Sequence, residues 1–131
     1  MKHTPRRAVR ALALLAAIAG PGRTPVRDTL AASLVIGSSE GDVSALATDL
    51  RRAGLLKRGR GLLLAQAPGA ITLSQITNAV CGHLPHHQTP ADLHALASAR
   101  MFWAMEQGLC AVTLDDVLRD ARCLDLCEVQ A

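Results

Sequence analysis

Basic side chains are the residues of this sequence best placed for chemistry, and they gather in its first half. Residues 1–60 hold 11 Lys and Arg against 4 Asp and Glu, a net charge of +7, whereas residues 61–131 hold 3 against 7, a net charge of −4. Guanidinium and ammonium groups pair with phosphate, so this asymmetry indicates a polyanionic partner for the basic half. The aromatic content is only 2%, which argues against a single-strand binder that stacks bases on aromatic rings.

A second group of reactive side chains combines one cysteine with four histidines: Cys81, His83, His86, His87 and His94. One cysteine and two histidines could hold zinc or a redox metal. The spacing is not that of a recognised metal motif, and Pro85 places most of the group in a loop. We therefore expect an exposed polar loop and no metal or other cofactor; Cys81 and His94 are the candidate ligands should a metal be bound.

The other thiols, Cys110, Cys123 and Cys127, have no adjacent Lys or His that would activate them as oxidant sensors. Four cysteines in a chain of this length suggest no disulfide framework, which is typical of a reduced, cytoplasmic protein. The sequence contains no phosphate-binding P-loop and no evident Ser/His/Asp arrangement. We therefore expect a protein that is not an enzyme.

The elements that position these residues are predicted to be mainly helical, because the apolar residues are mostly Ala and Leu. The first twenty residues allow two interpretations. Basic residues before the apolar run 11–19 are typical of a signal peptide, and an exported protein would lose them. Alternatively, Pro5 opens a buried helix whose apolar residues recur at helical spacing: Val9, Leu12, Leu15, Ala16 and Ala19. The rest of the chain favours the helix, and this run is too short to span a membrane.

A helix–turn–helix is predicted between residues 26 and 54. A short helix over 26–34 leads into a tight turn at 36–39, and Ser39 is the candidate N-cap of the next helix. That helix has acidic residues in its first turn, a C-terminal stop at Gly54 and an apolar stripe of Val43, Leu46, Ala47 and Leu50.

Downstream, residues 55–65 are predicted to form a short two-stranded wing with a basic tip. A helix capped by Thr72 or Ser74 follows, and then the longest helix, over about 90–108, which is apolar on more than one face. Thr113 is expected to cap a last short helix. The predicted organisation is a DNA-binding region at 1–67, a dimerisation region at 68–121 and a tail at 122–131.

These segments, in this order, resemble the Rrf family of bacterial winged-helix regulators, which includes iron–sulfur, nitric-oxide and cysteine-metabolism regulators. The resemblance covers residues 2–121. It is carried by a basic first helix, RRAVRALALLA at 6–16, by LRRAGL at 50–55, by the helix at 71–80, and by a second Thr-Leu segment at 112–118. It implies a winged helix-turn-helix with a long dimerisation helix, acting as a homodimeric regulator on double-stranded DNA and not on a membrane.

The chain also departs from the family pattern. The wing is shorter than the family's Gly-rich hairpin, and the interval where cluster-binding members place three cysteines holds only Cys81 and Cys110. A family-type iron–sulfur cluster is therefore not expected. Because the recognition helix offers few base-reading groups, an alternative is a degenerate winged-helix protein that serves as a dimerising protein-interaction module without specific DNA binding.

Two sets of site residues follow from these predictions. The predicted DNA-contacting residues lie on the first helix, the helix–turn–helix and the wing: Arg6, Arg7, Arg10, Arg27, Ser39, Glu40, Ser44, Arg51, Arg52, Lys57, Arg58 and Arg60. The predicted dimer interface uses the large apolar side chains of the long helix: Leu93, Leu96, Met101, Phe102, Trp103 and Met105.

Overall fold

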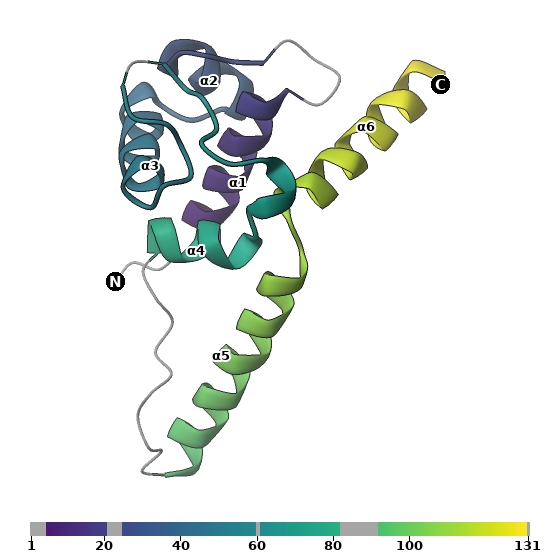
Figure 1. Cartoon of the computed structure of the whole chain (residues 1–131). Coiled ribbons are helices and arrows are strands. Elements are labelled where there is room, and N and C mark those ends of the chain that lie inside the picture. Colours follow the sequence, from purple (N-terminus) through teal and green to yellow (C-terminus); the bar gives the residue numbers. More distant parts are fainter. Residues whose placement is uncertain (1–4, 21–24, 60, 82–91, 131) are drawn as a thin grey trace.

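The computed structural model describes residues 5–20, 25–59, 61–81 and 92–130, with side chains for 6–20, 25–59, 61–81 and 92–123. The described residues form a mainly helical fold, as predicted (Figure 1). In chain order the elements are α1 (Pro5–Ala19), α2 (Thr29–Ile36), α3 (Glu40–Arg52), the 3-10 helix η1 (Pro68–Ala70), α4 (Leu73–Cys81), α5 (Leu93–Ala111) and α6 (Leu114–Gln130).

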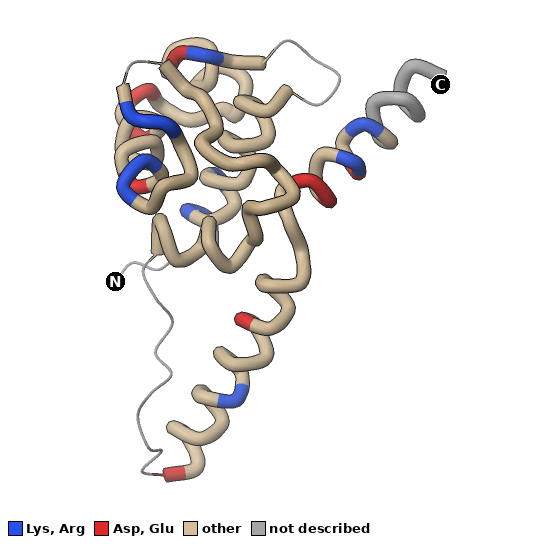
Figure 2. Tube along the Cα trace, in the orientation of Figure 1, with Lys and Arg blue, Asp and Glu red and all other residues tan. Residues whose placement is uncertain are grey.

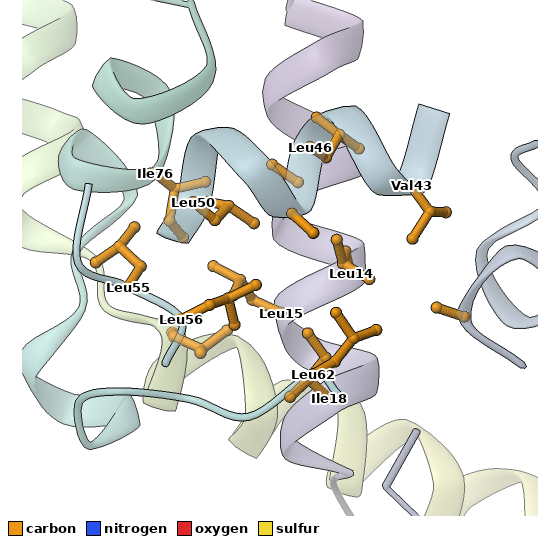
Figure 3. Close-up of a cluster of buried hydrophobic side chains, with 14 of the residues drawn as sticks. Leu14, Leu15, Ile18, Val43, Leu46, Leu50, Leu55, Leu56, Leu62 and Ile76 are labelled. Atoms are coloured by element: carbon orange, nitrogen blue, oxygen red, sulfur yellow. The ribbon is translucent and has the colours of Figure 1, made fainter. Parts of the chain in front are cut away.

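The hydrophobic core lies between α1, α3 and α4 and is closed by the segment after α3 (Figure 3). Helix α1 contributes Ala11, Leu14, Leu15 and Ile18, all at most 2% exposed. The prediction of a buried first helix is therefore confirmed, but the buried stripe is not the predicted one. Val9 is exposed, because the buried stripe of α1, which packs mainly on α2 and α4, is shifted around the helix.

The two Thr-Leu segments pair with each other, which the sequence did not predict. Thr72 and Thr113 form an antiparallel bridge, and the N–H groups of Leu73 and Leu114 donate to the carbonyls of Val112 and Ile71 at 2.9 and 2.8 Å. Each threonine also caps the helix that follows it: Gln75 N–H donates to Thr72 Oγ1, and Asp116 N–H to Thr113 Oγ1. The pairing fixes the start of α6 on the start of α4, and Ile71 and Leu114 join the core.

The predicted two-stranded wing is wrong for the described residues, among which no strand forms. At the expected place there is one isolated antiparallel bridge, Leu56 to Leu64, and Lys57 N–H donates to the Leu63 carbonyl at 2.8 Å. The reason is burial. Consecutive residues of a ribbon point to opposite faces, but here Leu55 and Leu56 are both in the core. The segment is held down over the core instead of projecting as a hairpin.

Three predicted boundaries also differ from the structure. The first helix of the helix–turn–helix begins at Thr29 instead of residue 26, because Asp28 caps it by accepting from Ala31 N–H at 2.7 Å. The long helix runs over Leu93–Ala111, after its N-cap Asp92. Helix α6 continues through the segment predicted as a tail, as far as Gln130.

Candidate nucleic-acid interface

Helices α2 and α3 are joined by a turn that local side chains define at both ends. Gly37 ends α2 with φ +70°, a left-handed conformation that favours glycine, and the N–H groups of Gly37 and Ser38 both donate to the Ser33 carbonyl. Ser39 then begins α3 by accepting from Asp42 N–H at 3.1 Å, as predicted. This turn sets α3 across the core, with its predicted apolar stripe buried: Val43, Leu46, Ala47 and Leu50.

The opposite face of α3 is exposed and consists mostly of small side chains. Gly41, Ser44, Ala45 and Thr48 line it, and Glu40 and Asp42 lie at its start. Thr48, whose hydroxyl donates to the Ser44 carbonyl at 2.9 Å, was missed by the sequence analysis. Its spacing of four residues from Ser44 was the available signal. Of the α3 residues predicted to contact DNA bases, Ser44 and Glu40 are exposed on or near this face. The Ser39 hydroxyl instead accepts the N-cap hydrogen bond.

Arg7 binds other parts of the protein, so its guanidinium is not free to contact a ligand. Its guanidinium lies 2.8 Å from the Asp49 carboxylate on α3 and also donates to the Val80 carbonyl near the end of α4. The side chain is 32% exposed, so this arginine joins α1, α3 and α4. Arg10 and Arg52 have looser ion pairs, at 3.8 Å to Asp42 and 3.7 Å to Asp49.

Arg27 and Arg51 both bind backbone carbonyls. Arg27 Nη1 donates to the carbonyls of Ile18 and Val26 at 2.9 and 3.0 Å, which fixes the approach to α2. Arg51 Nη2 donates to the Gly61 carbonyl at 3.0 Å, and its Nε is buried with no hydrogen-bond partner among the described residues. These two arginines line one hollow together with the start of α2.

The remaining predicted cations with described side chains are exposed. Arg6, Lys57 and Arg58 lie at the surface and make no ion pair with a described residue. Basic residues gather at the end of α3 and on the segment after it (Figure 2). Arg60, predicted for the wing tip, lies outside the described residues. The described cations that follow α3, Lys57 and Arg58, thus lie at one edge of the helix–turn–helix.

Helix α5 carries the predicted dimer residues and extends away from the α1–α4 core (Figure 1). None of its residues, all of which are described, is buried. Leu93, Leu96, Met101, Trp103 and Met105 are exposed, with Leu93 at 82% and Trp103 at 56%. Phe102 differs: it is half-buried, on the same side of the helix as Glu106 and Leu109.

The candidate metal ligands are not brought together. Cys81 ends α4 and His94 is exposed on α5, whereas His83, His86 and His87 lie outside the described residues. In the described part of the chain no three His, Cys, Asp or Glu side chains are grouped to hold a metal ion. Burial raises the pKa of the Cys81 thiol, and the Arg7 charge offsets this only in part.

Comparison with solved structures places the fold. The chain is similar to T. potens IscR with a TM-score of 0.68 and 29% identity, over 88% of this chain and 83% of that one. It is similar to Staphylococcus aureus CymR in its oxidised form (TM-score 0.69, 20% identity, 90% and 96% covered). It is also similar to CymR of B. subtilis, the global cysteine regulator (TM-score 0.68, 24% identity, 91% and 98% covered).

No family model and no curated protein matches the sequence. No helix among the described residues has both the length and the apolar character needed to cross a membrane. Because the solved structures share the order and packing of helices over most of both chains, the resemblance stated from the sequence is confirmed at the level of the fold. The chain has the fold of the Rrf-family regulators.

Proposed function

We propose that this protein is a transcription regulator that binds double-stranded DNA as a homodimer. The observation that carries the proposal is the helix–turn–helix itself. Helix α3 is capped at Ser39, buries one stripe and leaves the opposite face exposed, beside the exposed cations Lys57 and Arg58. A helix presented in this way fits the major groove, and flanking cations meet the phosphates on either side. The similarity to IscR and CymR supports the same role.

Backbone contacts are expected to supply most of the affinity. The outer face of α3 has short side chains, and its first turn is acidic, so few groups can hydrogen-bond to base edges. Ser44 and Thr48 are its polar side chains near the middle of the helix. Phosphate contacts fix position without reading sequence, so specificity is expected to be modest and to depend in part on DNA shape.

The homodimer is proposed on the character of α5. Helix α5 has 19 residues, none of which is buried, and Leu93, Trp103 and Met105 are exposed on it. The hydrophobic core of a single protomer therefore does not cover this helix. Interfaces are enriched in Trp and Met. A second copy that packs on α5 would bury this surface and present two α3 helices to one duplex.

The proposal is tested by titrating the protein onto duplex DNA from the promoter region of its own operon, at several salt concentrations. Regulator function predicts tighter binding to one promoter segment than to a shuffled duplex, and a linear fall of log affinity with log salt. Equal affinity for both duplexes would indicate loss of specific recognition. No binding at low salt would contradict the proposal.

Replacing Lys57 and Arg58 together by alanine should weaken binding to every duplex to a similar degree. Both side chains are exposed and unpaired among the described residues, so each is available for a phosphate. The slope of log affinity against log salt should become shallower by about 1.8 for each protomer. The matched control removes the same charge from α6, Arg119→Ala with Arg122→Ala, and should leave the slope unchanged. Equal slopes for the two double variants would contradict a role for this segment in DNA binding.

A further inference from the structure

Two arginines of α1 face two aspartates of α3, and the two ion pairs differ. The Arg7 and Asp49 side chains lie 2.8 Å apart and are 32% and 24% exposed. The Arg10 and Asp42 side chains lie 3.8 Å apart and are 44% and 56% exposed. Because 3.8 Å is longer than a hydrogen bond, Arg10 and Asp42 attract each other without using their donors and acceptors on each other. The first pair fastens α3 to α1, whereas the second is open to solvent.

The exposed pair lies at the edge of the outer face of α3. Arg10 and Asp42 line a hollow of about 290 Å³ between α1 and α3. Its other lining residues are Arg6, Arg7, Ala45 and Leu46. Ala45 also belongs to the exposed face of small side chains on α3. The hollow therefore opens beside the surface that the proposed function directs into the major groove.

Small neighbours leave space next to the Asp42 carboxylate. At Gly41, a Cβ would have only the Ser39 hydroxyl within 4 Å outside the helix backbone, at 3.9 Å. Ala45, almost one turn further along α3, carries only a methyl group. A flat base edge can therefore approach this part of α3 closely. The charged groups beside it are then the Asp42 carboxylate and the Arg10 guanidinium.

This pair of charges matches one base pair in the major groove. Guanine presents two acceptors there, N7 and O6, and the cytosine paired with it presents a donor, the N4 amino group. Arginine donates to the two guanine acceptors, and aspartate accepts from cytosine N4. In a T·A pair, thymine O4 replaces the cytosine donor with an acceptor, which would repel a carboxylate. In an A·T pair, adenine N7 would repel it, and thymine would offer arginine one acceptor instead of two.

We propose that Arg10 and Asp42 together read one C·G base pair in each half of the binding site, with Asp42 on cytosine N4 and Arg10 on guanine O6 and N7. The inference rests on the proposed function, since it requires α3 to lie in the major groove. Arg10 has a second effect, because its charge offsets the repulsion between Asp42 and the neighbouring phosphates. An acidic residue that is unfavourable by itself on a DNA-contacting helix thereby contributes to sequence specificity.

Asp42→Asn tests the contact to cytosine. An asparagine amide pairs with N6 and N7 of adenine, so the preferred base at one position should change from cytosine to adenine. Asp120→Asn is the matched control, because Asp120 is exposed on α6 and its substitution removes the same charge away from α3. It should leave the base preference unchanged. Circular dichroism checks that both variants keep the helical content of the original protein.

Arg10→Met tests the contact to guanine. Methionine is similar in length but has no donor, so the preference for guanine opposite that cytosine should be lost. Arg122→Met, at an exposed arginine of α6, is the matched control and should keep it. The two contacts belong to one base pair, so Asp42→Asn and Arg10→Met should alter the preference at the same position. An ion pair with a merely structural role would not move that preference.

The first measurement selects bound duplexes from a pool of randomised sequence, with the full chain and each variant, and sequences them. We expect the original protein to select C·G at one position of each half-site, Asp42→Asn to select A·T there, and Arg10→Met to select no base there. Identical selection by Asp42→Asn and the original protein would overturn the proposal. So would changes at two different positions in the two variants.

The second measurement titrates the chain onto two duplexes that differ only at this position. Replacing C·G by A·T should weaken binding of the original protein by about tenfold for each half-site and should reverse the order for Asp42→Asn. Equal affinity of the original protein for both duplexes would reject the base contact and leave the proposed function standing. Absence of binding to any duplex would contradict the proposed function and the base contact together.

Discussion

Trp103→Glu should convert the proposed homodimer into a monomer. Trp103 is 56% exposed on α5, so its ring is available at the surface of the helix. The Arg100 guanidinium, on the same helix, lies 5.9 Å from the ring centre. Large aromatic side chains at the centre of an interface carry much of the binding energy. A carboxylate buried there without a partner would be strongly unfavourable. Light scattering coupled to size-exclusion chromatography measures the mass directly.

Leu34→Glu is the matched control for this prediction. Leu34 is 76% exposed on α2, away from α5, and the same charge there should leave the protein dimeric. Because no residue of α5 belongs to the core, the monomer should keep its helical circular dichroism. It should also bind duplex DNA far more weakly, since two linked contacts become one. A dimeric Trp103→Glu protein would contradict the assignment of α5 to the interface.

Leu50→Ala should lower the free energy of unfolding by about 2–5 kcal/mol, the range for large-to-small changes at buried leucines. Leu50 is 0% exposed and anchors the end of α3 against Leu15, Leu55 and Ile76 in the core (Figure 3). Removing its isobutyl group leaves a cavity that the surrounding helices can fill only in part. Since small domains have about 5–15 kcal/mol in total, the effect is a large share of the stability. Urea denaturation followed by circular dichroism measures it.

Leu34→Ala is the matched control for Leu50→Ala, because it makes the same chemical change at an exposed site. Its effect should stay within about 0.5 kcal/mol. Similar losses of stability in the two variants would show that the core does not lie where the structure places it. The denaturant slope should be the same for both proteins, since neither substitution changes the surface exposed on unfolding by much.

The caps and stripes of the helix–turn–helix could be read from the sequence because they depend on short-range contacts. Ser39 caps through a bond to a residue three positions away, and Gly37 is required by its own backbone conformation. The stripe on α3 follows from helical periodicity alone. The first helix was harder: Val9 was expected in its apolar stripe but is exposed, because α1 is rich in Ala and Leu on several faces.

The fate of each arginine depended on the tertiary structure. In sequence, Arg7, Arg27 and Arg51 are equivalent to Arg6 and Arg58 as cations. In the structure, Arg7 reaches the carbonyl of Val80, 73 residues away, and Arg51 reaches Gly61. No local pattern could indicate these acceptors, because they are backbone atoms brought close only by packing. The positive charge left free to contact a polyanion is therefore smaller than the net charge of +7 over residues 1–60 suggests.

The sequence by itself determined the mainly helical class, which follows from composition, and the helix–turn–helix with its caps, which depends on residues within a few positions of one another. It also determined the family resemblance, which follows from the order of such segments along the chain. The tertiary structure decided which cations remain exposed, how Thr72 pairs with Thr113, and that residues 55–64 lie on the core instead of forming a ribbon. It also placed the start of α2 beside Arg51. These outcomes depend on contacts between residues distant in sequence, whose energies are fixed only when the core closes.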